Sequence, residues 1–314
     1  MSNWKSYKNG NYIVKINLSN GTKIRYTKDD TMIPEYPESM DITITNQCNN
    51  ECTWCYMGCT KNGKHGDIMN AKFIDTLLPY TELAINGNSM NHPDLTKFLE
   101  KLKSKNLIAN ITVNQQDFMN NLDILRYYRD NNLIYGIGIS LVSPTDEFIK
   151  CVKEFPNSVI HVVNGIARKE MLEKLYNKGL KILILGYKDV GFGEYYYKNF
   201  SDGVDNLKKE MYNNLENMMD KFDVISFDNL ALEQLEVKRL LSDKEWDEFF
   251  MGDDGYEEFT SASMYVDLVN NTFSFNSMDK ERFTLMDNVK DMFDYLKTKK
   301  SKNRKQGIDK TSDV

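Results

Sequence analysis

The feature that most constrains the fold is a repeated alternation of short β-branched runs with amphipathic stretches of helical length. Short strands that alternate with helices are typical of βαβ units, whose strands are parallel and whose crossovers are right-handed. We therefore predict an α/β fold whose core is a partial, TIM-like (β/α)6 barrel. The strands are expected at 41–45, 83–85, 108–113, 135–141, 159–163 and 181–185, and the helices at 71–78, 95–105, 120–130, 145–155 and 168–178.

The segments that flank this alternation have different patterns. Two alternating runs at 12–18 and 22–26 surround Asn20-Gly21, a dipeptide suited to the positive φ of a tight turn, and predict an N-terminal β-hairpin. After residue 200 the pattern predicts a C-terminal α+β extension. Its expected elements are helices at 204–222, 231–240, 243–250 and 287–298, a seventh strand at 224–227, and a second hairpin formed by 263–269 and 272–275.

Four parts follow from these patterns. We expect a hairpin and lead-in at 1–40, the core at 41–200, an extension that closes the substrate side at 201–298, and a disordered tail at 299–314. The tail has six Lys or Arg against two Asp, whereas the whole chain has a net charge of -6. The body is therefore acidic and would repel phosphate, which argues against a nucleic-acid partner.

The hydropathy of the sequence predicts where in the cell the protein is located. No apolar run approaches the roughly 18 to 20 residues that span a bilayer, so we expect no membrane contact. The first residues contain no apolar signal core, which predicts a cytoplasmic protein with reduced thiols.

Polar residues follow each predicted strand. In a parallel sheet of this kind ligands lie at the carboxyl ends of the strands, so these residues are expected to share one edge. They are Asn46 to Cys55, Asn86 to Ser89, Asn114 to Gln116, Ser143, Asn164-Gly165 and Gly186 to Lys188.

The cysteines are unevenly placed. Four of the five, Cys48, Cys52, Cys55 and Cys59, are close together after the first core strand, and Cys151 stands apart. In a reducing compartment such a group indicates zinc or an iron–sulfur cluster. A non-catalytic, zinc-stabilised α/β binding protein would use all four thiolates, or three with His65, whereas three thiolates alone would leave one iron of a four-iron cluster open.

The spacing CxxxCxΦC, with Trp54 at the aromatic position, resembles the signature of the radical S-adenosylmethionine (radical SAM) superfamily over about 41–188. The resemblance implies a single 4Fe-4S cluster on Cys48, Cys52 and Cys55, with SAM bound at the fourth iron. A one-electron donor such as flavodoxin or ferredoxin would then drive cleavage of SAM to methionine and a 5'-deoxyadenosyl radical. That radical would abstract hydrogen from a small-molecule or peptide substrate.

The same resemblance implies the contacts of SAM. The segment Asn86-Gly87-Asn88-Ser89 stands where the family has a Gly-Gly-Glu-Pro-like turn that holds the methionine ammonium. Other positions correspond to ribose and adenine contacts or flank the cysteines. The full set is Trp54, Tyr56, Asn86, Gly87, Asn88, Ser89, Ser140, Asn164, Gly186 and Tyr187.

The sequence identifies no certain catalytic residue. Cys59 and His161 are the candidates, because each places a proton-carrying side chain in the predicted core. Candidate substrate contacts are polar residues after predicted strands or in the extension: Gln116, Asp228, Asn229, Gln234 and Asp267.

Overall fold

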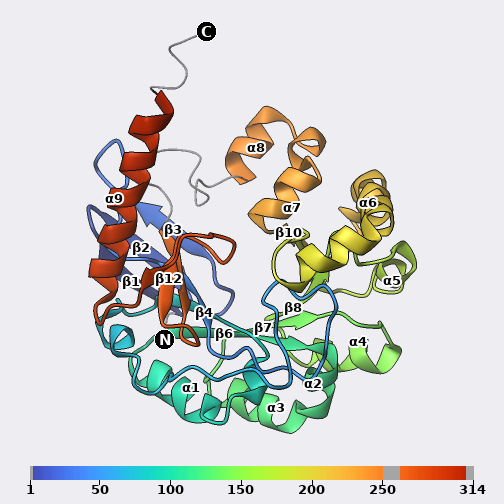
Figure 1. Cartoon of the computed structure of the whole chain (residues 1–314), viewed down its shortest axis with the longest axis horizontal. Helices are drawn as coiled ribbons and strands as arrows, with labels where there is room; N and C mark the ends of the chain where they lie inside the picture. The colour runs from blue at the N-terminus through green and yellow to red at the C-terminus, as the bar shows by residue number, and fades with distance from the viewer. Residues whose placement is uncertain (1–2, 250–261, 309–314) are drawn as a thin grey trace.

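The computed structural model describes residues 3–249 and 262–308 (Figure 1). Its main element is a ten-stranded sheet with the order β10-β9-β8-β7-β6-β5-β4-β11-β12-β13. All six predicted core strands and the predicted seventh strand are present, and they pair in parallel in chain order. They are β4 (Ser39–Thr43), β5 (Glu82–Asn86), β6 (Ile108–Asn114), β7 (Gly136–Ser140), β8 (Ser158–Val163), β9 (Lys181–Leu185) and β10 (Val224–Phe227).

The second hairpin is also present, but it belongs to the same sheet. β11 (Ser263–Asp267) pairs in parallel with β4, and β12 (Thr272–Ser274) and β13 (Phe283–Thr284) follow as antiparallel strands. In the described part of the chain the edges of the sheet are β10 and β13, so the sheet is open. Figure 1 shows the sheet curved, with α9 beside one end and α7 beside the other.

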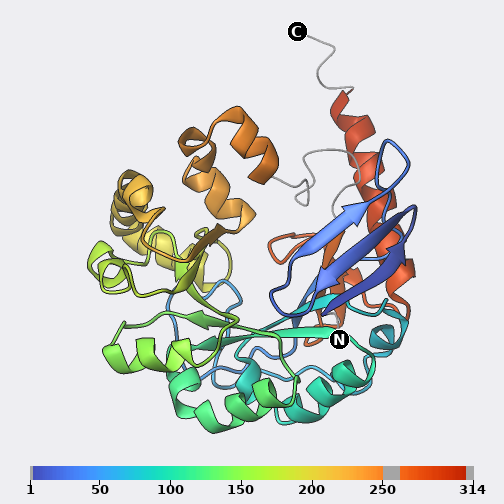
Figure 2. The ribbon, with the colours of Figure 1, turned by 180° about the vertical axis from the view of Figure 1, so that it is seen from behind.

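A smaller antiparallel sheet precedes the main one. The prediction of a two-stranded hairpin was incomplete, because β2 (Tyr12–Asn17) pairs with β3 (Lys23–Tyr26) and also with an additional strand, β1 (Trp4–Asn9). The turn between β1 and β2 contains Gly10 at φ +59°, a conformation that glycine adopts without strain. Figure 2 shows this sheet beside the β4–β11 end of the main sheet.

The core strands have one buried, apolar face and one half-buried face, which is polar in β6 and mixed in β8 and β9, where Val159 and Leu183 lie beside His161. Ile111 and Val113 of β6 are buried, whereas Asn110, Thr112 and Asn114 between them are only half-buried. The same alternation recurs in β5, β7, β8 and β9. Parallel strands covered on both faces are usually apolar throughout, so the polar face indicates a surface available for ligands.

Helices cover the apolar face. α1 (Leu95–Ser104), α3 (Leu122–Asp130) and α4 (Asp146–Lys153) lie along the outer side of the curved sheet (Figures 1 and 2). Phe98, Leu125 and Phe148 are fully buried representatives of this interface. At about 1.5 to 3 kcal/mol for each buried large apolar side chain, this interface is the main source of stability.

Several predicted helices differ in extent. The segment 71–78 contains only a 3-10 helix, η1 (Lys72–Thr76), and 168–178 only α5 (Lys169–Glu173). The predicted helix 120–130 is preceded by α2 (Gln115–Asn120), from which Asn121 separates α3. A second 3-10 turn, η2 (Ser89–Asn91), follows β5.

The C-terminal helices also differ from the expected ranges. α6 (Phe192–Met218) begins earlier than residue 204 and has non-helical φ/ψ at Phe200. α7 (Asn229–Gln234) and η3 (Val237–Leu240) divide the predicted helix 231–240, whereas α8 (Asp243–Phe249) confirms the helix predicted at 243–250 as far as the described residues extend. α9 (Val289–Ile308) continues through the first part of the predicted disordered tail, and residues 309–314 lie outside the described residues.

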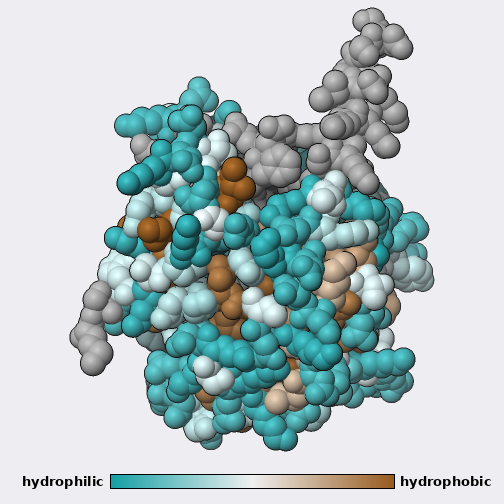
Figure 3. Space-filling model, turned by 90° about the vertical axis from the view of Figure 1, so that its left-hand side faces the viewer, coloured by the Kyte–Doolittle hydropathy of each residue, from teal (hydrophilic) through white to brown (hydrophobic). Residues whose placement is uncertain are grey.

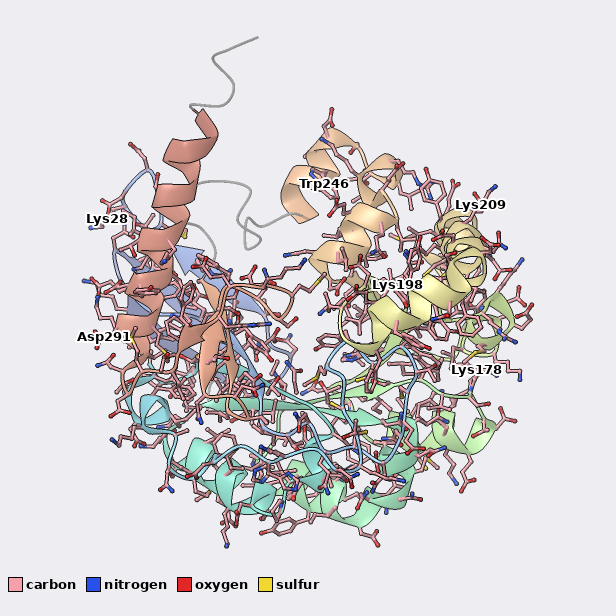
Figure 4. The ribbon with its side chains drawn as sticks, viewed as in Figure 1. Lys28, Lys178, Lys198, Lys209, Trp246 and Asp291 are labelled. Carbon is pink, nitrogen blue, oxygen red and sulfur yellow. The ribbon has the colours of Figure 1, made fainter. Side chains whose placement is uncertain are left out.

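The exterior is mainly polar. Lys28, Lys178 and Lys209 lie at the periphery (Figure 4), and the face seen in Figure 3 is mostly hydrophilic with small hydrophobic areas. Within the described residues, each helix is too short or too polar to cross a membrane.

Gly138 leaves room for a side chain of the neighbouring strand. A Cβ added at Gly138 would lie 2.2 Å from Cε1 of His161, which occupies the neighbouring strand β8. We expect Gly138→Ala to destabilise the fold by about 1 to 3 kcal/mol through overpacking. In the His161→Ala background the same change is expected to cost much less, because the clashing ring is gone.

Chemical denaturation of the single and double variants measures this coupling. Gly203→Ala is the matched control, since a Cβ there meets no atom within 4 Å. Equal costs of Gly138→Ala in both backgrounds would show that the ring does not occupy this space.

Candidate cofactor-binding site

The cysteine-containing loop begins after β4, and its last residues return to the end of the same strand. The backbone N–H of Asn46 donates to the carbonyl of Lys64 at 3.0 Å, and that of Gly66 donates to Ile44 at 2.8 Å. Higher in the loop, the N–H of Cys48 donates to the carbonyl of Thr60 at 2.8 Å. These bonds fix the loop at the carboxyl end of the first core strand, as its sequence predicted.

The tip of the loop packs against the start of α6. The N–H of Phe192 donates to the carbonyl of Cys55 at 3.0 Å. Gly191 has φ +59°, and a Cβ there would lie 2.3 Å from the carbonyl oxygen of Tyr56. The Trp54 ring meets that of Tyr196 edge-on with centroids 5.9 Å apart. The ring of Trp54 is therefore engaged in holding the loop against α6.

The four thiols of this loop differ in environment. Cys48, Cys52 and Cys55 are half-buried, and Cys59 is buried. A hydrogen bond from the Cys59 thiol lowers the pKa of Cys55 to about 6. Burial and the neighbouring sulfurs raise the pKa of Cys52 to about 11. The protein alone therefore favours one thiolate here, and a bound cation would be needed to stabilise three.

The positions of Cys59 and His65 can be compared with what a zinc site would require of a fourth ligand. Among the described residues, no group of three or more His, Cys, Asp or Glu side chains is placed to hold a single ion. Cys59 donates to Cys55, and its thiol pKa is raised by that bond and by burial. His65 Nδ1 is hydrogen-bonded to the Thr45 hydroxyl at 2.9 Å, and the His65 ring packs against that of His92. Cys59 and His65, the two candidates for a fourth zinc ligand, are therefore each engaged in another hydrogen bond.

A hydrogen-bond network joins Cys48 to the loop after β5. The Asn50 and Asn88 amides each donate to Oδ2 of Asp117 at 2.8 Å. Each amide nitrogen also faces the Cys48 sulfur, at 3.4 Å for Asn50 and 3.7 Å for Asn88. Asn88 is only 6% exposed, and its Oδ1 has no hydrogen-bond partner among the residues that the structure describes. A buried acceptor without a partner is costly and indicates a place for a donor ligand.

The other residues of the Asn86–Ser89 segment shape this loop. Gly87 has φ +91°, and a Cβ there would lie 2.3 Å from the Thr45 carbonyl oxygen. The Ser89 hydroxyl is fully buried and bonds to the carbonyl oxygens of Ile85 and Thr112. Ser89 therefore braces the loop, and Asn88 is the member of the segment that offers a free polar atom.

A second cluster unites predicted cofactor and substrate residues. Gln234 Oε1 accepts from the Asn164 amide at 3.1 Å and from the Tyr187 N–H at 2.9 Å. Oδ1 of Asp228 caps α7 by accepting from Ala231 and also accepts from the N–H of Gly186, both at 2.8 Å. Asp228 and Gln234 therefore tie α7 to the ends of β8 and β9.

Tyr187 and Asn164 differ in whether a side-chain polar atom lacks a hydrogen-bond partner. The Tyr187 ring is buried and its hydroxyl donates to the carbonyl of Gly193 at 2.7 Å. Asn164 is fully buried, and its Oδ1 has no partner within the described ranges. Asn164 is thus the second residue of the predicted cofactor set with a free acceptor.

The polar face of the sheet encloses two cavities. The larger, of about 360 Å³, is lined by Asp41, Glu82, Asn110, Asn229 and neighbouring residues of β4, β5, β6 and β11. A smaller one of about 150 Å³ lies between the cysteine loop and β11, with Tyr56 and Asp267 in its wall. In parallel register Ser140 lies between Asn114 and His161 on the same face.

Lys188 lies near the cysteine loop. Its Nζ is 4.2 Å from the Tyr56 ring centroid and 3.1 Å from the Ser277 hydroxyl. Burial lowers its pKa, whereas the carboxylates of Asp228 and Asp41 act in the opposite direction. Asp41 lines the larger cavity, and burial raises the pKa of its carboxyl group, whereas the charge of Lys188 and a hydrogen bond from Asn86 act in the opposite direction. The sequence placed Lys188 at the ligand edge, but it did not single out Asp41, which begins the first predicted core strand.

Of the other residues predicted to contact substrate, one closes a turn, one is exposed to solvent and one lines the larger cavity. The Asp267 carboxylate accepts from the N–H groups of Val269 and Asn270 and so closes the β11–β12 turn. Gln116 is exposed, and the next residue, Asp117, makes the contacts with the cysteine loop. Asn229 does line the larger cavity. The signal for Asp117 was its position in the polar stretch after the third strand.

Comparison with known proteins supports the fold. No protein-family model matches the chain, and no curated protein matches its sequence. The crystal structure of Streptococcus suis SuiB bound to S-adenosylmethionine aligns over 95% of this chain and 88% of that chain, with a TM-score of 0.58 and 11% identity. A second structure of Streptococcus suis SuiB covers 90% and 85%, with a TM-score of 0.54 and 13% identity. BtrN in complex with AdoMet and 2-DOIA has a TM-score of 0.31 over 62% and 92%, at 12% identity. At these identities the SuiB likeness shows a shared α/β fold.

The environment of His161 predicts a pH dependence. Burial lowers its pKa to about 4, below the ordinary value of about 6.5. Between these values the unfolded chain binds a proton that the folded chain does not. The stability that the neutral ring contributes is therefore present above about pH 6.5 and lost as the pH falls toward 4.

Two-dimensional NMR of the three histidines and denaturation from pH 7 to 4 measure this effect. His161→Gln should flatten the acid side of the stability profile, whereas His65→Gln, with a ring that is more exposed, should change it less. A His161 ring that titrates near pH 6.5 would contradict the expected burial.

Proposed function

We propose that the protein is a radical SAM enzyme with a 4Fe-4S cluster on Cys48, Cys52 and Cys55. The observation that carries the proposal is the position of this three-cysteine loop, directly after the first parallel strand and in contact with the loop after the second. The fold shared with SAM-bound SuiB adds support. We further propose that the open, curved sheet acts as the partial (β/α)6 barrel and that residues 201–298 close its substrate side.

The free acceptors fit the two ends of SAM. The Asn88 Oδ1 would accept a hydrogen bond from the methionine ammonium. Ser140 and the Oδ1 of Asn164 would bind the nucleoside end, near the backbone of Gly186 and Tyr187. The Cys59 thiol would donate to the Cys55 sulfur as a neighbour of the cluster, without ligating it.

Cys48, Cys52 and Cys55 would hold the cluster, which would supply the one electron for reductive cleavage of SAM and so the radical chemistry of hydrogen abstraction. The protein residues bind, orient and exclude water. The cavity of about 360 Å³ lies on the polar face and fits a small molecule or one peptide side chain. Asp41, Asn110 and Asn229 would contact that substrate.

The proposed reaction needs an electron donor, and the thiols and net charge of the chain bear on its cellular location and its substrate. The electron requires a donor such as flavodoxin or ferredoxin, and the reduced thiols fit the cytoplasm. The acidic charge of the chain disfavours nucleic acid as the substrate.

Anaerobic reconstitution tests the proposed function. We expect a brown protein with about four irons per chain, and 5'-deoxyadenosine after addition of dithionite and SAM. Cys52→Ala should lose the iron, because it removes a ligand, whereas Cys59→Ala and the remote control Cys151→Ala should retain it.

The zinc-stabilised binding protein predicts a different pattern. It requires one tightly held zinc, no cleavage of SAM, and loss of metal in Cys59→Ala as well as in Cys52→Ala. Metal analysis of the four proteins decides between the two functions.

A further inference from the structure

Asp117 joins two loops that meet at Cys48. It lies in the first turn of α2, after the third core strand, yet its carboxylate accepts from Asn50 in the cysteine loop and from Asn88 after β5. Both bonds reach the same oxygen, Oδ2, at 2.8 Å. One side chain therefore fixes two amides that belong to different loops.

The bonds fix the orientation of the Asn88 amide. A carboxylate accepts hydrogen bonds, so the NH2 group of each amide must face Asp117. In Asn88 that orientation also directs Nδ2 to the Cys48 sulfur and leaves Oδ1 without a partner among the described residues. Because Asn88 is 6% exposed, this oxygen is shielded from bulk water, and leaving it without a donor is costly.

Asp117 also supplies a charge that the Asn86–Ser89 segment lacks. That segment contains no carboxylate, so a bound ammonium would meet only the neutral Asn88. The charge of Asp117 lies one hydrogen bond away and polarises the amide, which makes Oδ1 a stronger acceptor. Charge-assisted hydrogen bonds are roughly twice as strong as neutral ones.

We propose that Asp117 is the positioning residue for the ammonium of SAM: it orients and polarises Asn88 so that Oδ1 accepts from that ammonium. The inference rests on the proposed function for the identity of the ligand. It adds a residue from the third strand's loop to the site and assigns to it the negative charge.

The test compares two ligands on reconstituted, unreduced protein. SAM has the amino-acid group, whereas 5'-methylthioadenosine retains the nucleoside and lacks that group. For Asp117→Asn we expect SAM to bind about tenfold more weakly, as for loss of one charge-assisted bond, and 5'-methylthioadenosine to bind as it does to the parent. Asp123→Asn, a fully exposed carboxylate on the next helix, is the charge-matched control and should affect neither ligand.

A charge exchange provides the second measurement. In the double variant Asn88→Asp/Asp117→Asn, the carboxylate moves onto the β5 loop and the amide onto α2, so the pair retains one hydrogen bond and one negative charge. We expect SAM affinity to recover to within about threefold of the parent. A residue that only braced the fold would not be rescued in this way.

The outcomes separate the inference from the proposed function. If the parent binds SAM and Asp117→Asn binds it equally well, or weakens both ligands equally, the positioning role is wrong while the enzyme class stands. If the parent takes up no iron and no SAM, both fall. Iron content and thermal unfolding of each variant, measured alongside, identify a folding defect, and in that case rescue by the double variant decides.

Discussion

The parallel pairing of β4 on both sides is the interaction on which the site depends. β4 binds β5 along one edge and β11 along the other, so the strand that carries the cysteine loop is central in the sheet. The backbone bonds between 44–46 and 64–66 then continue this order into the loop. Because β5 carries the Asn88 loop, the same pairing brings the cysteines and Asn88 together. The site is thus a consequence of sheet register more than of any side-chain contact.

Much of the fold could be predicted from local patterns. The core strands have β-branched runs of the right length, and their helices have apolar residues at helical spacing, so both were placed within a few residues. The first strand, β1, was missed because Trp4–Asn9 is mostly polar and contains no β-branched residue. The pairing of β11 with β4 joins residues more than 200 positions apart, and no local signal records such a contact.

The candidate site was predictable to a similar degree. The cysteine spacing and the polar ends of the strands predicted residues at one edge of the sheet, and the structure places the cysteine loop next to Asn88 there, while Asn88 and Asn164 each have an oxygen without a partner among the described residues. The sequence did not distinguish a polar residue that faces a ligand from one that caps a helix or closes a turn, as with Asp228 and Asp267. It also placed Gln116 where Asp117 makes the contacts, since adjacent positions in a helix point in different directions.

The cysteine loop is held by backbone hydrogen bonds within it and by its contact with α6. These contacts restrict the conformations of the loop, which lowers the ordering entropy that the proposed cluster would cost. What remains is an electrostatic cost, because burial and the adjacent sulfurs raise the pKa of Cys52 to about 11. In the proposed 4Fe-4S site the bound cluster would offset that cost and displace the proton of Cys52. Folding would then supply the geometry of the site, and the cluster would balance the charge.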